Sequence, residues 1–310
     1  MKFLCVAGSY EKSIYGVDLS VVKKNDASVS ADGGNNSDYD ITSTVAFALA
    51  AHTGVIKCVA SCEKFLATGS TDETIRIFDL RRRKDYGTIN LHLGTITALS
   101  FYQNDFLLSA SDDGFICISR CSDWEGLQKL RAHKHGVTAL GLHPSGKVVL
   151  SAGKDQKLKL WDLAKGKLAH SQTSSFVIDG IAWSPDGSLY AIFNSSNLSI
   201  FKASSSCPVF TQTAPFTKLL VISFLGNDKL ILAGEGSRIS IIHLETLTEE
   251  FFELNQRPRI RSITVSYLSP SPLIFTSSSD GLIHIWNSEF ASPLHTLKSG
   301  IRITCHTCTK

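Results

Sequence analysis

The stretch that decides the fold is Leu130–Leu163, LRAHKHGVTALGLHPSGKVVLSAGKDQKLKLWDL. It opens beside an Ala-His pair and closes on a Trp-Asp pair. Val148–Ser151 is a compact apolar run, and Lys157–Leu160 alternates lysine with leucine, which is the period-two pattern of a half-buried strand. Between these runs, Gly153–Gln156 has the composition of a tight turn. The stretch therefore predicts short antiparallel strands joined by turns.

Segments of this kind recur along the whole chain, and helical periodicity is almost absent. Short β-rich runs punctuated by Gly, Ser, Asp and Asn predict an all-β fold. A four-stranded unit with a His near its start and Trp-Asp at its end resembles a WD40 propeller blade, whose repeat is about 40–45 residues long. The number of copies then fixes the architecture.

A turn aspartate measures the repeat, and it occurs at Asp72, Asp113, Asp155 and Asp280. The first two steps are 41 and 42 residues, and the last step of 125 residues is three such periods. Two further blades must therefore lie in between, with turns near Asn197 and Arg238. Strand-like runs flank both places.

The two ends of the chain complete the count. Leu4–Leu19 is interpreted as the last two strands of a blade with Glu11 at their turn, and Pro293–Cys305 supplies two more runs. Half a blade at each end predicts one composite blade that closes the ring and removes exposed edges. The total is seven blades in a single domain spanning 1–310. The polar stretch Val21–Thr44 is expected to be a mobile loop between blades.

Polar residues repeat with the turn aspartates. A Ser or Thr lies four residues before the aspartate in all four repeats, a His lies 20 to 22 residues before it in three, and a Trp follows six after it in two. The sets are His52, Thr68 and Asp72; His92, Ser109 and Asp113; His133, Ser151, Asp155 and Trp161; Thr276, Asp280 and Trp286.

A Ser, a His and an Asp together could suggest a hydrolase triad, but an enzyme needs one site and this pattern recurs at a fixed period. The pattern instead predicts a buried relay in which the Asp holds the His, and the His reaches a strand hydroxyl and the Trp N–H. Only the set around His133 is complete. The fifth and sixth blades, counted along the chain with the composite blade first, lack the Asp and His, and we expect packing alone to hold them.

Composition excludes several classes of protein. The chain is 43% hydrophobic and 19% charged, so it can bury a substantial core, and its net charge of +3 does not by itself indicate a nucleic-acid surface. No apolar run approaches the roughly 20 residues of a membrane span. The eight cysteines are scattered, as expected of reduced thiols in an intracellular protein.

Other signals for chemistry are thin. The sequence has no phosphate-binding loop and no paired zinc signature. Cys305 and Cys308 have the spacing of half a metal site, and we interpret them as a core cysteine followed by a frayed tail. His135 lies two residues after His133, which is already assigned to the relay. We therefore expect no catalytic residue, no cofactor and no metal.

A basic run, Arg81, Arg82, Arg83 and Lys84, follows a predicted strand and is expected to lie in a connecting loop. It could contact phosphate or an acidic partner, or it could be a solvated loop without a binding role. Asp79-Leu80-Arg81 also faintly resembles the box by which some WD40 proteins dock onto a cullin–RING ubiquitin ligase.

Several stretches resemble one particular WD40 family more closely than the general repeat. They are Val6–Glu11, Thr68–Ile75, Gly94–Thr97 with Phe101 and Tyr102, Asp113–Ile118, Trp124 with Glu125, Ala132–Lys134, His143–Lys147, Ser278–Gly281 and Arg302–Cys305. Together they resemble the p21-activated-kinase-interacting WD-repeat proteins, whose fungal members act in assembly of the large ribosomal subunit. The resemblance covers the chain from Phe3 to Cys305.

The resemblance implies a non-enzymatic, monomeric scaffold of the nucleus and nucleolus, with the cytoplasm left open. Its implied partners are pre-60S ribosome assembly proteins and a p21-activated kinase that it binds and restrains, with indirect or weak rRNA contact and no membrane. Relatives often carry a Lys-rich tail, whereas this sequence ends at Lys310, so either this member lacks the tail or the sequence is truncated. The alternative function is a substrate-receptor adaptor of a cullin–RING ubiquitin ligase.

Overall fold

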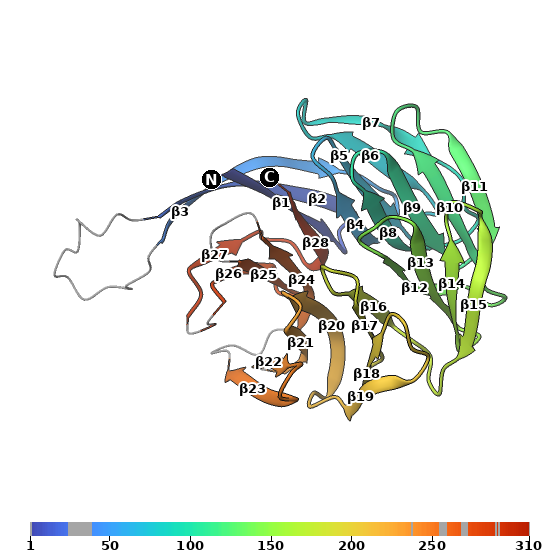
Figure 1. Cartoon of the computed structure of the whole chain (residues 1–310). Coiled ribbons are helices and arrows are strands. Elements are labelled where there is room, and N and C mark those ends of the chain that lie inside the picture. Colours follow the sequence, from blue (N-terminus) through green and yellow to red (C-terminus); the bar gives the residue numbers. More distant parts are fainter. Residues whose placement is uncertain are drawn as a thin grey trace.

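The computed structural model describes residues 2–23, 39–236, 238–253, 259–267, 272–288, 290 and 292–309. These residues form seven antiparallel sheets of four strands each, arranged as blades around a common axis (Figure 1). The predicted all-β, seven-bladed propeller is therefore confirmed. Within the described part of the chain, no helix is long and apolar enough to cross a membrane.

Six blades each take four consecutive strands, and we number them 2 to 7 in chain order. Blade 2 is β4–β7 (Ile56–Ser61, Phe65–Ser70, Ile75–Asp79, Lys84–Ile89), blade 3 is β8–β11 (Ile96–Tyr102, Phe106–Ser111, Phe115–Arg120, Gly126–Arg131) and blade 4 is β12–β15 (Val137–Leu142, Val148–Gly153, Lys157–Asp162, Lys167–Thr173). Blade 5 is β16–β19 (Gly180–Trp183, Leu189–Phe193, Asn197–Lys202, Pro208–Thr213), blade 6 is β20–β23 (Lys218–Leu225, Lys229–Glu235, Arg238–His243, Thr248–Glu253) and blade 7 is β24–β27 (Ile260–Ser266, Leu273–Ser278, Leu282–Trp286, His295–Lys298).

The first strand of each blade lies innermost, where it contacts the first strands of both neighbouring blades. The second strand is buried on both faces because it lies between two neighbouring sheets, and it accordingly reads as a nearly continuous apolar or small run. Phe65–Ser70 and Val148–Gly153 each have five fully buried positions out of six. The core therefore consists of apolar layers between successive blades rather than one central cluster.

Blade 1 is the composite blade, with the strand order β28-β1-β2-β3. Its innermost strand is β28 (Ile303–Thr309), which pairs along β1 (Lys2–Ser9) from Leu4 opposite Thr309 to Ser9 opposite Ile303. Closure by a composite blade is thus as predicted, but the expected division into two halves is wrong. The C-terminal segment gives one strand and the N-terminal segment gives three, because the run at His295–Lys298 is the outer strand of blade 7.

The expected loop at Val21–Thr44 needs correction at both ends. β2 (Ser13–Lys23) and β3 (Tyr39–Ala50) pair over their whole length, from Ser13 opposite Ala50 to Lys23 opposite Tyr39, and this hairpin extends well beyond the other strands (Figure 1). Val21 and Ile41 are buried in one cluster with Leu297 of blade 7, which explains why the strands continue so far. The insertion therefore lies within blade 1 and not between blades, and residues 24–38 are outside the described part.

The sequence repeat is offset from the structural blade by one strand. Leu130 and Arg131 end the outer strand of blade 3, whereas Trp161 lies in the third strand of blade 4, and the fourth strand, β15, comes after the Trp-Asp pair. Each repeat therefore supplies the outer strand of one blade and three strands of the next. Each repeat therefore contributes strands to two neighbouring blades.

Replacing Ile303 by Ala tests whether β28 closes the ring. Ile303 is completely buried, so the substitution should lower the free energy of unfolding by about 2–5 kcal/mol. Val45→Ala is the matched control, because Val45 on the outer strand β3 is 63% exposed and its truncation should change stability by no more than about 0.5 kcal/mol. Urea titration followed by tryptophan fluorescence measures both. Equal midpoints for the two variants would contradict the assigned closure.

Candidate interaction surfaces

The complete polar set of blade 4 forms a continuous chain of hydrogen bonds. His133, in the loop before β12, donates from Nδ1 to Asp155 Oδ1 at 2.8 Å and accepts at Nε2 from Ser151 Oγ at 2.8 Å. Trp161 Nε1 donates to the same Ser151 Oγ at 3.0 Å. The chain joins the entry loop, the turn between the second and third strands, and both of these strands.

Blades 2 and 3 repeat this geometry without a tryptophan. In both blades the His Nδ1 lies 3.0 Å from an oxygen of the turn aspartate, and Nε2 lies 2.8 Å from the strand hydroxyl. The residues are His52, Thr68 and Asp72 in blade 2, and His92, Ser109 and Asp113 in blade 3.

Blade 7 lacks the histidine of this set. Trp286 Nε1 donates to Thr276 Oγ1 at 2.9 Å, and Asp280 accepts from Ser278 Oγ and from the Leu282 N–H within its own turn. The buried His306 of β28 instead hydrogen-bonds the adjacent Ser277 hydroxyl at 2.8 Å, so the contact crosses from blade 1 to blade 7. No spacing rule in the sequence could have identified this histidine.

Burial controls the electrostatics of these sets. Desolvation lowers the pKa of His52, His92 and His133, because it disfavours the charged ring more strongly than the nearby aspartate favours it. The pKa of Asp155 is lowered despite desolvation, which would raise it, because the hydrogen bond and electrostatic interaction with His133, together with the backbone N–H groups of Lys157 and Lys134, outweigh burial. Ser151 is completely buried and is held by two partners, so no substrate can reach its hydroxyl.

The expectation that packing alone holds blades 5 and 6 is wrong. Glu249 in β23 accepts from Ser240 Oγ within blade 6 and, at 2.7 Å, from Gln212 Nε2 in the outer strand of blade 5. A polar contact thus joins the outer parts of these two blades. Glu249 has no counterpart in the repeat pattern, and sequence spacing therefore missed it.

The His143–Lys147 turn, which distinguishes this sequence most clearly, connects three blades. His143 accepts at Nδ1 from the Ser145 N–H at 3.0 Å, and its Nε2 lies 3.3 Å from the Gly187 carbonyl of blade 5. On the other side, Gly146 has a φ of 68° and lies against the ring of Tyr102 in blade 3, where any Cβ would collide with the ring. The turn therefore has a structural role between blades.

Similar contacts follow one another around this face, which is formed by the turns between first and second strands. We call them the turn belt, and its members are Glu63 with Asn104, Tyr102 with Gly146, His143 with Gly187, Asp186 with Asn227, and Gly226 with Tyr267. They connect blades 2 to 7 in sequence. These residues are not marked by the repeat, so the sequence analysis did not single out the belt as a whole.

The basic run Arg81–Lys84 lies at the turn between β6 and β7. Only its first three residues form the turn, because Lys84 begins β7, which corrects the predicted loop. Arg83 pairs with Asp18 of blade 1 at 2.5 Å, and Asp79 accepts from two backbone N–H groups of the turn. Arg81 lines a cavity of about 390 Å³ together with both end strands, β1 and β28. Arg83 therefore ties the turn to blade 1, although all four residues of the run are exposed.

The two C-terminal cysteines do not share a site. Cys305 and Cys308 both lie in β28, so the expected frayed tail is wrong in this region. Cys305 packs against blade 2, and Cys308 is opposite Cys5 of β1. Burial raises the pKa of the Cys305 thiol to about 11, which disfavours the thiolate that metals bind. Within the described ranges, no group of three or more His, Cys, Asp or Glu could hold a metal.

Comparison with known proteins agrees with this architecture. The family model for the WD domain, G-beta repeat, matches residues 43–79, 83–118, 124–162 and 253–287. The chain is 32% identical over 306 residues to a p21-activated protein kinase-interacting protein 1-like protein of Danio rerio, covering 97% of this chain and 78% of that one.

Two fungal proteins are also related. Shk1 kinase-binding protein 15 of Schizosaccharomyces pombe is 26% identical over 309 residues, covering 97% of this chain and 82% of its own. Protein MAK11 of Saccharomyces cerevisiae is 33% identical over 168 residues, covering 48% of this chain and 38% of its own. The structure is that of a WD-repeat β-propeller of a family whose named members are binding proteins. The chain belongs to the family of p21-activated protein kinase-interacting protein 1.

Replacing Asp155 by Ala tests the role of the blade 4 relay. The change leaves the His133 Nδ1–H buried without its acceptor, which should lower the free energy of unfolding by about 1–3 kcal/mol. Gln156→Ala in the same turn is the control, because this exposed side chain should contribute no more than about 0.5 kcal/mol. Chemical denaturation measures both. Normal stability of D155A would rule out a stabilising relay.

Stability should also fall as the pH is lowered. Burial lowers the pKa of His306 to about 4, below the unfolded value of about 6.5, so the unfolded chain binds the proton first. The stability from neutral His306 is complete above about pH 6.5 and is lost as the pH falls toward 4. Unfolding at pH 7.5 and 5.0 measures this loss, which should be smaller in H306L and unchanged in H135L, where the replaced His is exposed. The same loss in all three proteins would exclude His306 as its source.

Proposed function

We propose that this protein is a non-enzymatic scaffold of the nucleus and nucleolus that acts in 60S ribosomal subunit assembly and binds, and restrains, a p21-activated kinase. The observation that carries the proposal is sequence similarity over 97% of the chain to proteins named for binding such a kinase. It spans all seven blades and not only the generic repeat. The assembly role rests on the resemblance of the non-repeat stretches to fungal members of the family.

The geometry supports a binding role. The recurring His, Ser and Asp side chains are engaged in hydrogen bonds inside the blades, and Ser151 is completely buried. What the described residues offer to other molecules is a closed ring with two loop-lined faces and an outer rim. In folds of this kind, function resides in surfaces placed on the scaffold and not in the scaffold itself.

Affinity purification of the tagged full chain from nuclear extract, with identification of the bound proteins, tests this proposal. We expect large-subunit assembly factors and a p21-activated kinase among them. Depletion of the protein should lower 60S subunits while 40S subunits stay comparatively constant, which sucrose-gradient profiles measure.

Two results would overturn the proposal. Unchanged ratios of the subunits after depletion would remove the assembly role. Capture of a cullin adaptor that is lost in R81E, in place of assembly factors and kinase, would establish the ubiquitin-ligase alternative suggested by Asp79–Arg81. Asp85→Lys is a matched control for charge reversal, because Asp85 lies on the adjacent strand β7 and is exposed.

A further inference from the structure

Positive charge is concentrated in one short part of this chain. Residues 129–159 contain seven Lys or Arg and a single acidic residue, Asp155, and so carry a net charge of +6. The whole chain carries +3, which leaves −3 for all the other residues together. The low overall charge therefore conceals a strongly basic segment.

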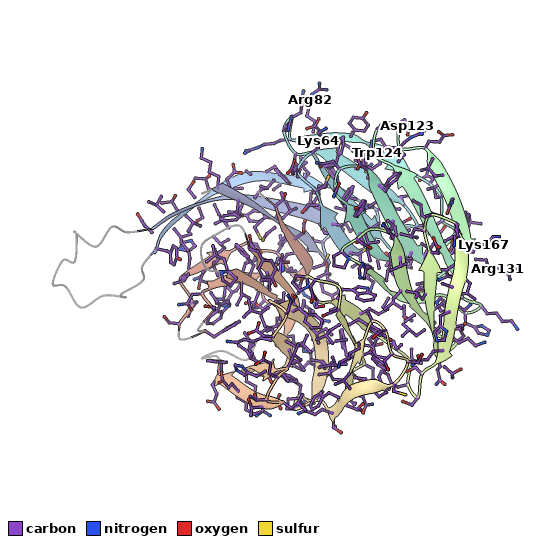
Figure 2. All side chains as sticks on the ribbon, viewed as in Figure 1. Lys64, Arg82, Asp123, Trp124, Arg131 and Lys167 are labelled. Carbon is purple, nitrogen blue, oxygen red and sulfur yellow. The ribbon has the colours of Figure 1, made fainter. Side chains whose placement is uncertain are left out.

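Six of these cations lie on the outer strand of blade 3, in the loop that follows it, or at the turn that enters β14 of blade 4. They are Lys129 and Arg131 on β11, Lys134 in the following loop, and Lys154, Lys157 and Lys159 on or beside the turn that enters β14. We call this set the blade 4 basic surface. Figure 2 shows Arg131 projecting from the outer rim of the ring.

Two hydrogen bonds to backbone carbonyls show that these segments are adjacent. Lys159 Nζ donates to the Ala132 carbonyl at 2.5 Å, and the Lys154 N–H donates to the Gly136 carbonyl at 3.2 Å. The turn at 153–156 is therefore tied to the loop at 132–136. Arg131, Lys134 and Lys154 therefore lie on adjacent segments of blades 3 and 4, whereas Lys129 is directed to the Leu91 carbonyl at the boundary with blade 2.

The acidic groups beside this surface are already engaged. Asp155 is the hydrogen-bond acceptor of buried His133, and Asp112 pairs with Lys154 at 2.8 Å. Arg131, Lys134 and Lys157 are exposed, and none forms an ion pair or side-chain hydrogen bond with another residue in the described part of the chain. Three cations are thus available to an external anion.

The composition of the surface indicates which anion it suits. The aromatic ring beside the set is Phe115, opposite Arg131, and it is half-buried and covered by the Lys129 ammonium group 4.7 Å from its centroid, so it does not offer a free face on which an unpaired base could stack. The six members of the set are all cationic, and one exposed large apolar residue, Leu127, precedes Lys129 by two positions on β11. Double-stranded RNA is recognised chiefly through its phosphates and 2′-hydroxyls, which need cations and hydrogen-bonding groups without stacking.

We propose that the blade 4 basic surface binds the phosphate backbone of a double-helical RNA segment. The inference deepens the ribosome-assembly part of the proposed function, for which it names the RNA-contacting surface. Binding of RNA by the purified chain is measured independently of kinase binding and subunit ratios, so failure of either proposal leaves the other testable.

The test compares two triple variants of the full chain. R131Q/K134Q/K157Q removes the three unpaired cations, and K64Q/K202Q/K298Q removes three exposed lysines from blades 2, 5 and 7. Lys129 and Lys159 are retained because their ammonium groups bind backbone carbonyls. Thermal unfolding verifies that both variants are folded. Figure 2 shows Lys64 well away from Arg131 in this view.

Fluorescence anisotropy with a labelled RNA duplex of about 20 base pairs, at salt concentrations between about 50 and 200 mM, measures binding. The native chain should prefer the duplex to either single strand. The blade 4 variant should bind on the order of 100-fold more weakly near 0.1 M salt, and its log–log salt slope should decrease by about 3. The control variant should keep the native slope.

Three outcomes would overturn the proposal. These are equal weakening in both variants, an unchanged salt slope in the blade 4 variant, or competition by polyglutamate at equal charge concentration as effective as that by unlabelled duplex. The last result would assign the surface to an acidic polypeptide instead.

Discussion

The ladder between β28 and β1 is the constraint on which the ring depends. Each of the other six blades forms from four consecutive strands, which are close together in the sequence. Blade 1 must bring together segments about 300 residues apart, and only this pairing gives β24 and β4 their common neighbour. Without it, the β1 edge would present unpaired backbone groups, which are templates for association with other chains, and β24 and β4 would lose a packing neighbour.

The polar contacts inside blades 2, 3, 4 and 7 follow one pattern, but the blades differ in which of its members are present. Blade 4 has the full chain from His133 to Trp161, blades 2 and 3 have it without the Trp, and blade 7 keeps the bond between Trp286 and Thr276 without the histidine. Blades 5 and 6 use Glu249 at their outer strands. Since a buried polar atom without a partner is costly, each blade that loses one member must satisfy the remaining atoms in some other way.

The sequence was sufficient for the blade count, the turn positions and the pairing of His, hydroxyl and Asp, because these follow from a fixed period and a local composition. It was insufficient wherever a contact joins unrelated positions of different blades, as Tyr267 with Gly226 or Glu249 with Gln212. The divided blade was misjudged for a similar reason: strand-like runs at the ends do not show which blade receives them. Val21 and Tyr39 were assigned to a loop because the residues between them are mostly polar. In the structure, both residues pack against blade 7, and the two strands are longer as a result.

The order of the strands in blade 1 has a consequence for biosynthesis. β1, β2 and β3 are the first strands to leave the ribosome, yet the strand that covers the inner edge of β1 is translated after all the others. During synthesis the growing chain is therefore an open arc with an exposed edge at its leading end, a state in which domains are prone to mispairing with neighbouring chains. β28 completes blade 1 after the other six blades have been made, and protection of the nascent chain by chaperones matters most in the interval before β28 pairs with β1.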